Sequence, residues 1–326
     1  MPIPTSKHDI TDGPDAMVTV GNGKYTITTG DGSSIVAGTG NDTIVTGANS
    51  TVTLGNGKHS ITAGDGSSIV AGTGNDTILT GVNSTITLGN GKHTITAGDG
   101  SKIAAGNGND TVQTGANSTV TLTNGKHSIT AGDDSSITAL NGNNTVLTGA
   151  TSTVTLGNGK DTITAGDGST ITARDGHDTV VTGANSIVTL GNGRDKVTAG
   201  DGSTVIVGNG NDTVTVGANS SVQVGNGTDT VFAGMNDIIT LGSGRDTVAF
   251  GVSSSLPIGN EVVNGFGKND VLEFNLALFV SYSAMVNAGD IVQSGSDTLI
   301  TDHAGNNVTL TGVTASSLTA NNFKFV

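Results

Sequence analysis

Aspartate residues at a constant spacing are the side chains of this sequence best suited to chemistry. Six are evenly spaced, at Asp161, Asp178, Asp195, Asp212, Asp229 and Asp246, and three more hold equivalent places at Asp42, Asp76 and Asp110. Nearly all of them end a Gly-x-Gly-x-Asp segment, in which glycine exposes backbone carbonyls beside the carboxylate. Ca²⁺ prefers six to eight oxygen ligands of these kinds. The pattern predicts calcium as a cofactor, bound at these nine aspartates.

The spacing also predicts how the aspartates lie relative to one another. If each 17-residue interval is one coil of a stack, successive carboxylates lie about 5 Å apart along one edge. Like charges at that distance reduce stability unless a cation lies between them. The alternative is that aspartate is present only because it favours tight turns.

Other residues interrupt this column of aspartates, which we call the first-turn column. In the first half, every second place holds Tyr25, His59, His93 and His127, preceded by Lys24, Lys58, Lys92 and Lys126, and Asn144 also replaces an aspartate. We expect the histidines to be solvated, and too far apart, at about 10 Å, to share a metal. A lysine ammonium is expected beside the neighbouring carboxylate. The first half is therefore predicted to be calcium-poor and the second half calcium-rich.

The elements that position these residues follow from an internal repeat. Near copies of GNGK return every 34 residues, at positions 21, 55, 89, 123 and 157. Residues 21–37 align without gaps on residues 38–54, so the repeat unit has 17 residues. Each unit has two short alternating stretches separated by Gly, Asn, Asp and Ser, which is typical of strands joined by turns. We expect about 15 such coils before the pattern stops at residue 258.

Apolar residues at fixed places in each coil predict a narrow shared core. Ile or Val recurs once per coil from Ile27 and again from Ile35, and a third column alternates Ala37-type with Leu54-type residues. Such columns are typical of stacked repeats in which each coil contacts only its neighbours. The predicted fold is all-β, a parallel β-roll or β-solenoid with a C-terminal β-rich cap.

Composition restricts the function classes. The chain has 326 residues, 52 of them Gly, no Cys, 3% aromatic residues and a net charge of −14. This charge argues against nucleic acid as a partner, and the lack of Cys excludes disulfides and thiolate metal sites. No apolar run is long enough for a transmembrane segment, and the N-terminus lacks the apolar core of a cleavable signal peptide.

We divide the chain into three parts. Residues 1–20 are expected to form an N-terminal arm and a degenerate first coil, residues 21–258 the solenoid, and residues 259–326 the cap, with a short helix near 282–287. The cap covers one end of the stack. The other end is expected to leave strand edges open, through which the N-terminal coil could self-associate.

The segment AGTGNDTIV at 37–45, with copies at 71–79 and 105–113, resembles the haemolysin-type calcium-binding repeats of the repeats-in-toxin family. The C-terminal residues, from FGKNDVLEFN to NNFKFV, are similar to the region that follows these repeats in the family. The resemblance implies a β-roll with calcium in its turns, type I secretion through an uncleaved C-terminal signal, and folding on meeting calcium outside the cell. Family coils are usually one residue longer and have two calcium turns, whereas here the second turn is shorter.

We therefore expect a secreted, calcium-binding structural protein of the cell surface or extracellular matrix, and not an enzyme. The alternative is an ice-binding β-solenoid, because Thr-x-Thr pairs resemble the faces of such proteins. These pairs are Thr26/Thr28, Thr94/Thr96 and Thr162/Thr164 on one sheet and Thr51/Thr53, Thr85/Thr87, Thr119/Thr121 and Thr153/Thr155 on the other. Incomplete pairs interrupt both arrays, and threonine is also an ordinary solvent-facing strand residue.

Overall fold

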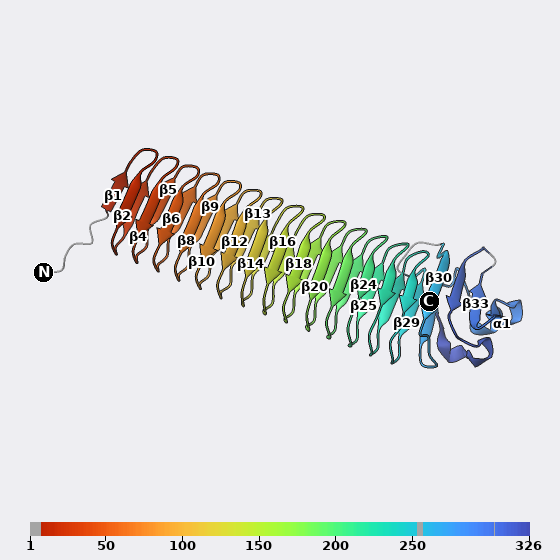
Figure 1. The fold of residues 1–326 in the computed structure, drawn as a ribbon. Coiled ribbons are helices and arrows are strands. Elements are labelled where there is room, and N and C mark those ends of the chain that lie inside the picture. Colours follow the sequence, from red (N-terminus) through yellow and green to blue (C-terminus); the bar gives the residue numbers. More distant parts are fainter. Residues whose placement is uncertain (1–7, 253–256, 303) are drawn as a thin grey trace. The chain divides into compact units, whose positions relative to one another are not determined.

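A computed structural model describes residues 8–252, 257–302 and 304–326. The chain is almost entirely β and forms a parallel β-solenoid of about 14 turns of about 17 residues, as the repeat predicts. It divides into two compact units, unit 1 with residues 1–162 and unit 2 with residues 163–326. Each coil contributes its first strand to sheet A and its second strand to sheet B (Figure 1).

The strands of unit 1 are mostly four residues long. In sheet A they are β1 (His8–Thr11), β3 (Tyr25–Thr28), β5 (Thr43–Thr46), β7 (Ser60–Ala63), β9 (Thr77–Thr80), β11 (Thr94–Ala97), β13 (Thr111–Thr114), β15 (Ser128–Thr130) and β17 (Thr145–Leu147). In sheet B they are β2 (Met17–Val20), β4 (Ser34–Ala37), β6 (Thr51–Leu54), β8 (Ser68–Ala71), β10 (Thr85–Leu88), β12 (Lys102–Ala105), β14 (Thr119–Leu122), β16 (Ser136–Ala139) and β18 (Thr153–Leu156).

The strands of unit 2 follow the same order, and β19 (Thr162–Ala165) contains the boundary. Sheet A has β21 (Thr179–Thr182), β23 (Lys196–Ala199), β25 (Thr213–Val216), β27 (Thr230–Ala233), β29 (Thr247–Phe250), β31 (Val271–Phe274) and β35 (Phe323–Phe325). Sheet B has β20 (Thr170–Ala173), β22 (Ile187–Leu190), β24 (Thr204–Ile206), β26 (Ser221–Gln223), β28 (Ile238–Thr240), β30 (Asn260–Asn264), β32 (Ile291–Ser294), β33 (Asp297–Thr301) and β34 (Asn307–Leu310).

Pairing within each unit confirms the repeat. Ile27 lies opposite Ile44 in sheet A, and Ile35 lies opposite Val52 in sheet B, both in parallel register. From these first members onward, the two Ile/Val columns are exposed by 2% or less. Because side chains alternate across a strand, the residues between them face solvent. The sequence columns therefore form the core.

Glycine in the first turn allows close contact between coils. A Cβ on Gly210 would lie 1.7 Å from the carbonyl oxygen of Gly193 in the preceding coil. The second turn has a left-handed residue instead, which in most coils is glycine, as at Gly32 with φ 70°, or asparagine, as at Asn49 with φ 54°. Both residue types adopt this conformation readily.

We expect Gly210→Ala to destabilise unit 2 by about 3 kcal/mol, because the added methyl group overlaps backbone that cannot move without breaking the ladder. Gly267→Ala is the matched control, since the nearest atom to its Cβ is Asp270 Oδ2 at 3.5 Å. Urea unfolding followed by circular dichroism measures both. Equal stability of the two variants would contradict the close packing of the first turns.

The strands of the cap extend both sheets of the solenoid. Strand β30 pairs in parallel with β28 and β34, and β31 pairs in parallel with β29 and β35. Two 3₁₀-helices, Ala315–Ser317 and Ala320–Asn322, and the helix α1 (Tyr282–Ala288), close to its predicted place, complete the cap. Phe274 stacks on Phe250, with ring centroids 5.4 Å apart, and meets Phe279 edge-on at 4.9 Å.

At the other end, β1 pairs with β3 and β2 with β4. The N-terminal arm, residues 1–7, lies outside the described residues. Among the described residues, no helix is long and apolar enough to cross a membrane.

Candidate metal site

In unit 2 the first-turn column is a ladder of buried carboxylates. Asp195, Asp212, Asp229 and Asp246 are each exposed by 2% or less, so this edge of the stack buries its carboxylates. In each pair, the backbone N–H of one aspartate donates to Oδ1 of the next. These N···O distances are 2.7 Å for Asp195 to Asp212, 2.8 Å for Asp212 to Asp229 and 2.9 Å for Asp229 to Asp246.

The second oxygen of these carboxylates is not hydrogen-bonded. Oδ2 of Asp195, Asp212, Asp229 and Asp246 is buried and has no hydrogen-bond partner. A buried polar atom without a partner costs stability, and a charged one costs more. Each of these atoms therefore favours a proton or a cation beside it.

Asn144, in the same column of unit 1, indicates what surrounds this oxygen. Its Nδ2 lies 3.5 Å from the carbonyl oxygen of Leu140 and 3.4 Å from that of Gly142. By the repeat, the corresponding carbonyls for Asp212 are those of Gly208 and Gly210. An asparagine N–H can donate to such carbonyls, whereas a carboxylate oxygen needs an intervening cation or proton.

The carboxylates of this ladder are held in an environment that disfavours their charge. The pKa of Asp195 is raised to about 6 and that of Asp229 to about 7, mainly by burial, with the charge of Asp212 contributing to both. Burial likewise raises the pKa of Asp212 and of Asp246, to which Asp270 also contributes. The repulsion expected from the spacing is therefore present, but burial is the larger cause.

The oxygen atoms around this column are suitable ligands for calcium. The column provides carboxylate oxygens that lack a partner, and the glycine turns provide carbonyls, so every ligand is oxygen. No group of three or more His, Cys, Asp or Glu side chains with metal-ligand geometry occurs in the part of the chain that the structure describes. A calcium ion here would therefore take most of its ligands from backbone carbonyls.

Two further predicted aspartates lie in the same column. Asp161 and Asp178 are exposed by 1% or less, and Asp178 N–H donates to Asp195 Oδ1 at 2.8 Å. Asp161 Oδ1 accepts from Asn144 N–H at 2.7 Å, and burial raises the pKa of Asp161.

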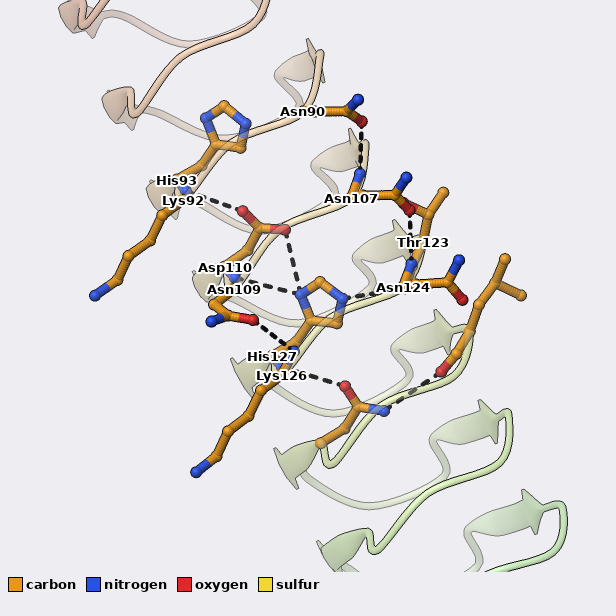
Figure 2. Close-up of polar contacts among 12 residues, drawn as sticks. Asn90, Lys92, His93, Asn107, Asn109, Asp110, Thr123, Asn124, Lys126 and His127 are labelled. Atoms are coloured by element: carbon orange, nitrogen blue, oxygen red, sulfur yellow. Dashed lines mark hydrogen bonds and ion pairs between the residues drawn. The ribbon is translucent and has the colours of Figure 1, made fainter.

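In unit 1 the predicted aspartates contact histidine. Oδ2 of Asp42, Asp76 and Asp110 lies 3.2 to 3.3 Å from Nδ1 of His59, His93 and His127, respectively. All three histidines are exposed by 2% or less, so the expectation that they are solvated is wrong. The lysines are exposed instead, and Figure 2 shows Lys92 and Lys126 pointing away from the carboxylate. Imidazole, not ammonium, thus lies beside the carboxylate.

The contacts of His93 affect the pKa of its imidazole ring. Its Nε2 lies 3.1 Å from the carbonyl oxygen of Gly89, its Nδ1 lies 3.2 Å from Asp76 Oδ2, and its backbone N–H donates to Asp110 Oδ1 at 2.9 Å. Burial lowers the pKa of His93, but the bonds to Asp76 and Gly89 and the charge of Asp110 outweigh it, so the pKa is raised. A protonated ring can donate from both nitrogens and balance a buried carboxylate, whereas a neutral ring can accept at Nδ1 from the Asp76 N–H, 3.3 Å away.

Three acidic residues of these columns were missed from the sequence. Asp270 extends the first-turn column, accepting from Asp246 N–H at 2.9 Å and Gly267 N–H at 2.7 Å. On the second-turn edge, Asp237 and Glu261 are fully buried, and burial raises their pKa values to about 6 and about 8. The signal was present, since Asp270 follows Asp246, and Glu261 follows Asp237, by one repeat plus a short insertion.

No family model matches this chain, and no curated protein matches it.

Proposed function

We propose that this protein is a calcium-binding β-roll with a structural role outside the cell, as a surface-layer, filament, matrix or adhesive component. The observation that supports this proposal is the row of buried Oδ2 atoms without a hydrogen-bond partner at Asp195, Asp212, Asp229 and Asp246. A divalent cation between successive turns relieves both their burial and their mutual repulsion. The calcium sites are proposed for unit 2.

An extracellular location is part of this proposal. Sites built largely from carbonyls bind calcium weakly and suit the high concentrations outside cells. Export by a type I system is proposed from the C-terminal resemblance. Because Phe323 is buried in the folded cap and β35 pairs with β31, a signal in this segment is readable only before the cap folds.

Calcium titration by isothermal calorimetry, with circular dichroism in parallel, tests the proposal. We expect Asp195→Asn and Asp212→Asn to lower the calcium stoichiometry, because each removes one charge while keeping an Oδ1 acceptor. The matched control is Asp201→Asn, on the exposed second-turn edge of the same unit, where Oδ1 accepts from Ala218 N–H at 2.8 Å. We also expect His93→Ala to leave the stoichiometry unchanged. No calcium binding by the native chain, or equal losses in all variants, would refute the assignment.

Ice binding is the second candidate function. On sheet A of unit 1, the first outward position of every coil is Thr or Ser from Thr26 to Thr162. The next outward position alternates Thr with larger residues such as Val45 and Leu79, which are 42% and 49% exposed. A thermal-hysteresis measurement separates the two functions, since a calcium-dependent structural protein need not arrest ice growth.

A further inference from the structure

The two turn edges of unit 1 carry exposed charges of opposite sign. On the first-turn edge, the residue before each column position is a lysine in every second coil, at Lys24, Lys58, Lys92, Lys126 and Lys160. The coils between them have Asn41, Asn75, Asn109 and Asn143 in that place. The lysines are exposed, whereas Asp42, Asp76 and Asp110 of the same edge, in the coils between them, are buried. We call this row the lysine edge.

The opposite edge carries the complementary row. Exposed aspartates occupy the second turn of every second coil at Asp31, Asp65, Asp99 and Asp133. The coils between them have the neutral residues Ala48, Val82, Ala116 and Ala150. We call this row the aspartate edge.

The two rows have the same period and the same phase. Lys58 and Asp65 belong to one coil, Lys92 and Asp99 to the coil two further on, and every other pair follows the same rule. Two coils correspond to about 10 Å along the stack. A second copy placed beside the first therefore brings four of the lysines opposite the four aspartates when one pair is in register.

Hydrogen bonds fix the backbone that carries both rows. Lys58 N–H donates to Asn41 Oδ1, and Lys92 N–H donates to Asn75 Oδ1, both at 2.8 Å. Asp65 Oδ1 accepts from Val82 N–H at 2.9 Å, which leaves its second oxygen on the exposed rim. Figure 2 shows Lys92 and Lys126 projecting side by side in the same direction. Such preorganisation lowers the entropic cost of association.

We propose that copies of this chain associate side by side, with the lysine edge of unit 1 in one copy against the aspartate edge of unit 1 in the next. The occupant is a second copy because the chain itself provides both complementary rows at one spacing. The contact joins two different surfaces, so each pair leaves one lysine edge and one aspartate edge free, and assembly continues into a raft. This inference extends the proposed structural role but does not require calcium in unit 1.

The expected strength of association is the sum of several weak ion pairs. A single exposed ion pair contributes roughly a factor of 1.5 to 5 in the equilibrium constant, so four pairs together give about five- to several-hundredfold. Salt screens exposed charges over about 10 Å at 0.1 M ionic strength. Association is therefore expected to weaken at least about tenfold when ionic strength rises from about 0.02 to about 0.3 M.

Sedimentation velocity of the full chain in calcium tests the proposal, with circular dichroism to show that each variant is folded. Lys58→Glu/Lys92→Glu/Lys126→Glu should abolish association, because both edges become acidic. Asp65→Lys/Asp99→Lys/Asp133→Lys should do the same, because both edges become basic. An equimolar mixture of these two variants should associate again, in alternating order. Lys92→Glu, on the lysine edge, should weaken association. Its matched control is Lys102→Glu, which makes the same charge change on the face of β12 and should have little effect on association.

Three results would overturn the proposal. One is a monomeric native chain at about 0.1 mM and low ionic strength. The second is association that survives both triple variants, which would place the contact elsewhere, for example at the N-terminal coil. The third is association that requires an added polyanion and is unchanged by Asp65→Asn/Asp99→Asn, which would assign the lysine edge to an anionic polymer. Calcium binding is scored separately by calorimetry, so its failure and the failure of lateral association are distinguishable.

Discussion

Acidification in the presence of chelator is expected to stabilise unit 2, in contrast to the usual acid sensitivity of folded proteins. The pKa of Asp195 is raised from 3.8 to about 6 and that of Asp229 from 3.8 to about 7. A group with a raised folded-state pKa contributes stability that is present below its unfolded value and is lost as pH rises through its folded value. Metal-free unit 2 should therefore become more stable as pH falls from about 7.5 to about 4.5.

Calcium should reverse this dependence. Above the raised pKa values the carboxylates are charged and bind the cation, whereas at lower pH protons compete with it. A thousandfold excess over Kd stabilises the folded state by about 4 kcal/mol per site, so the difference between calcium and chelator should be large near pH 8 and small near pH 5. Hydrogen exchange resolved by peptide, corrected for intrinsic rates, measures this across β23 to β29.

Asp212→Asn provides the control for the pH experiment. The variant keeps the Oδ1 acceptor and resembles the native Asn144, whose amide faces backbone carbonyls. It should be at least as stable as the native chain in chelator at pH 8 and should gain less from calcium. Stability of metal-free unit 2 that falls steadily between pH 7 and pH 5 would contradict the assignment of the buried carboxylates as the destabilising groups.

Replacing the first-turn histidines of unit 1 by aspartate should make the stability of unit 1 depend on calcium, and the reverse replacement should make unit 2 less dependent on it. His59→Asp/His93→Asp/His127→Asp removes three imidazoles that each lie within 3.3 Å of a carboxylate and adds three buried carboxylates in their place. Loss of a partner from a buried ion pair typically costs about 3 to 5 kcal/mol, so unit 1 should unfold in chelator at neutral pH. Calcium should restore its protection from hydrogen exchange.

The reciprocal exchange uses Asp195→His and Asp229→His in unit 2. Each new imidazole would follow an aspartate, Asp178 or Asp212, in the order found in unit 1. The doubly substituted unit should need less calcium for stability, and its stability in chelator should fall as pH rises through the histidine pKa. His59→Asn/His93→Asn/His127→Asn is the control, because it removes the imidazoles without adding a negative charge. A triple aspartate variant as stable in chelator as this control would disprove the role of the imidazoles.

The fold and the positions of the candidate site follow from local periodicity. A short repeat that places Ile27, Ile44 and Ile61 on one face leaves little choice except a stack of parallel strands in register. The same periodicity places every first-turn aspartate in a single column. Period and spacing are properties of the chain alone, so the solenoid, its narrow core and the aspartate column are predictable without coordinates.

The environment of the column is a property of the packed coils, and the histidines within it were wrongly expected to be solvated. The same Gly-x-Gly-x-Asp spacing is compatible with a solvated rim and with the buried ladder that forms, in which one oxygen accepts the preceding backbone N–H and the other has no partner. Burial depends on how closely the turns stack, and that distance is set by the contact between glycines such as Gly193 and Gly210. The packing of the coils also determines that His93, and not Lys92, lies beside Asp76. Adjacent residues of an extended turn point in opposite directions, and only the packed coil determines which one faces inward.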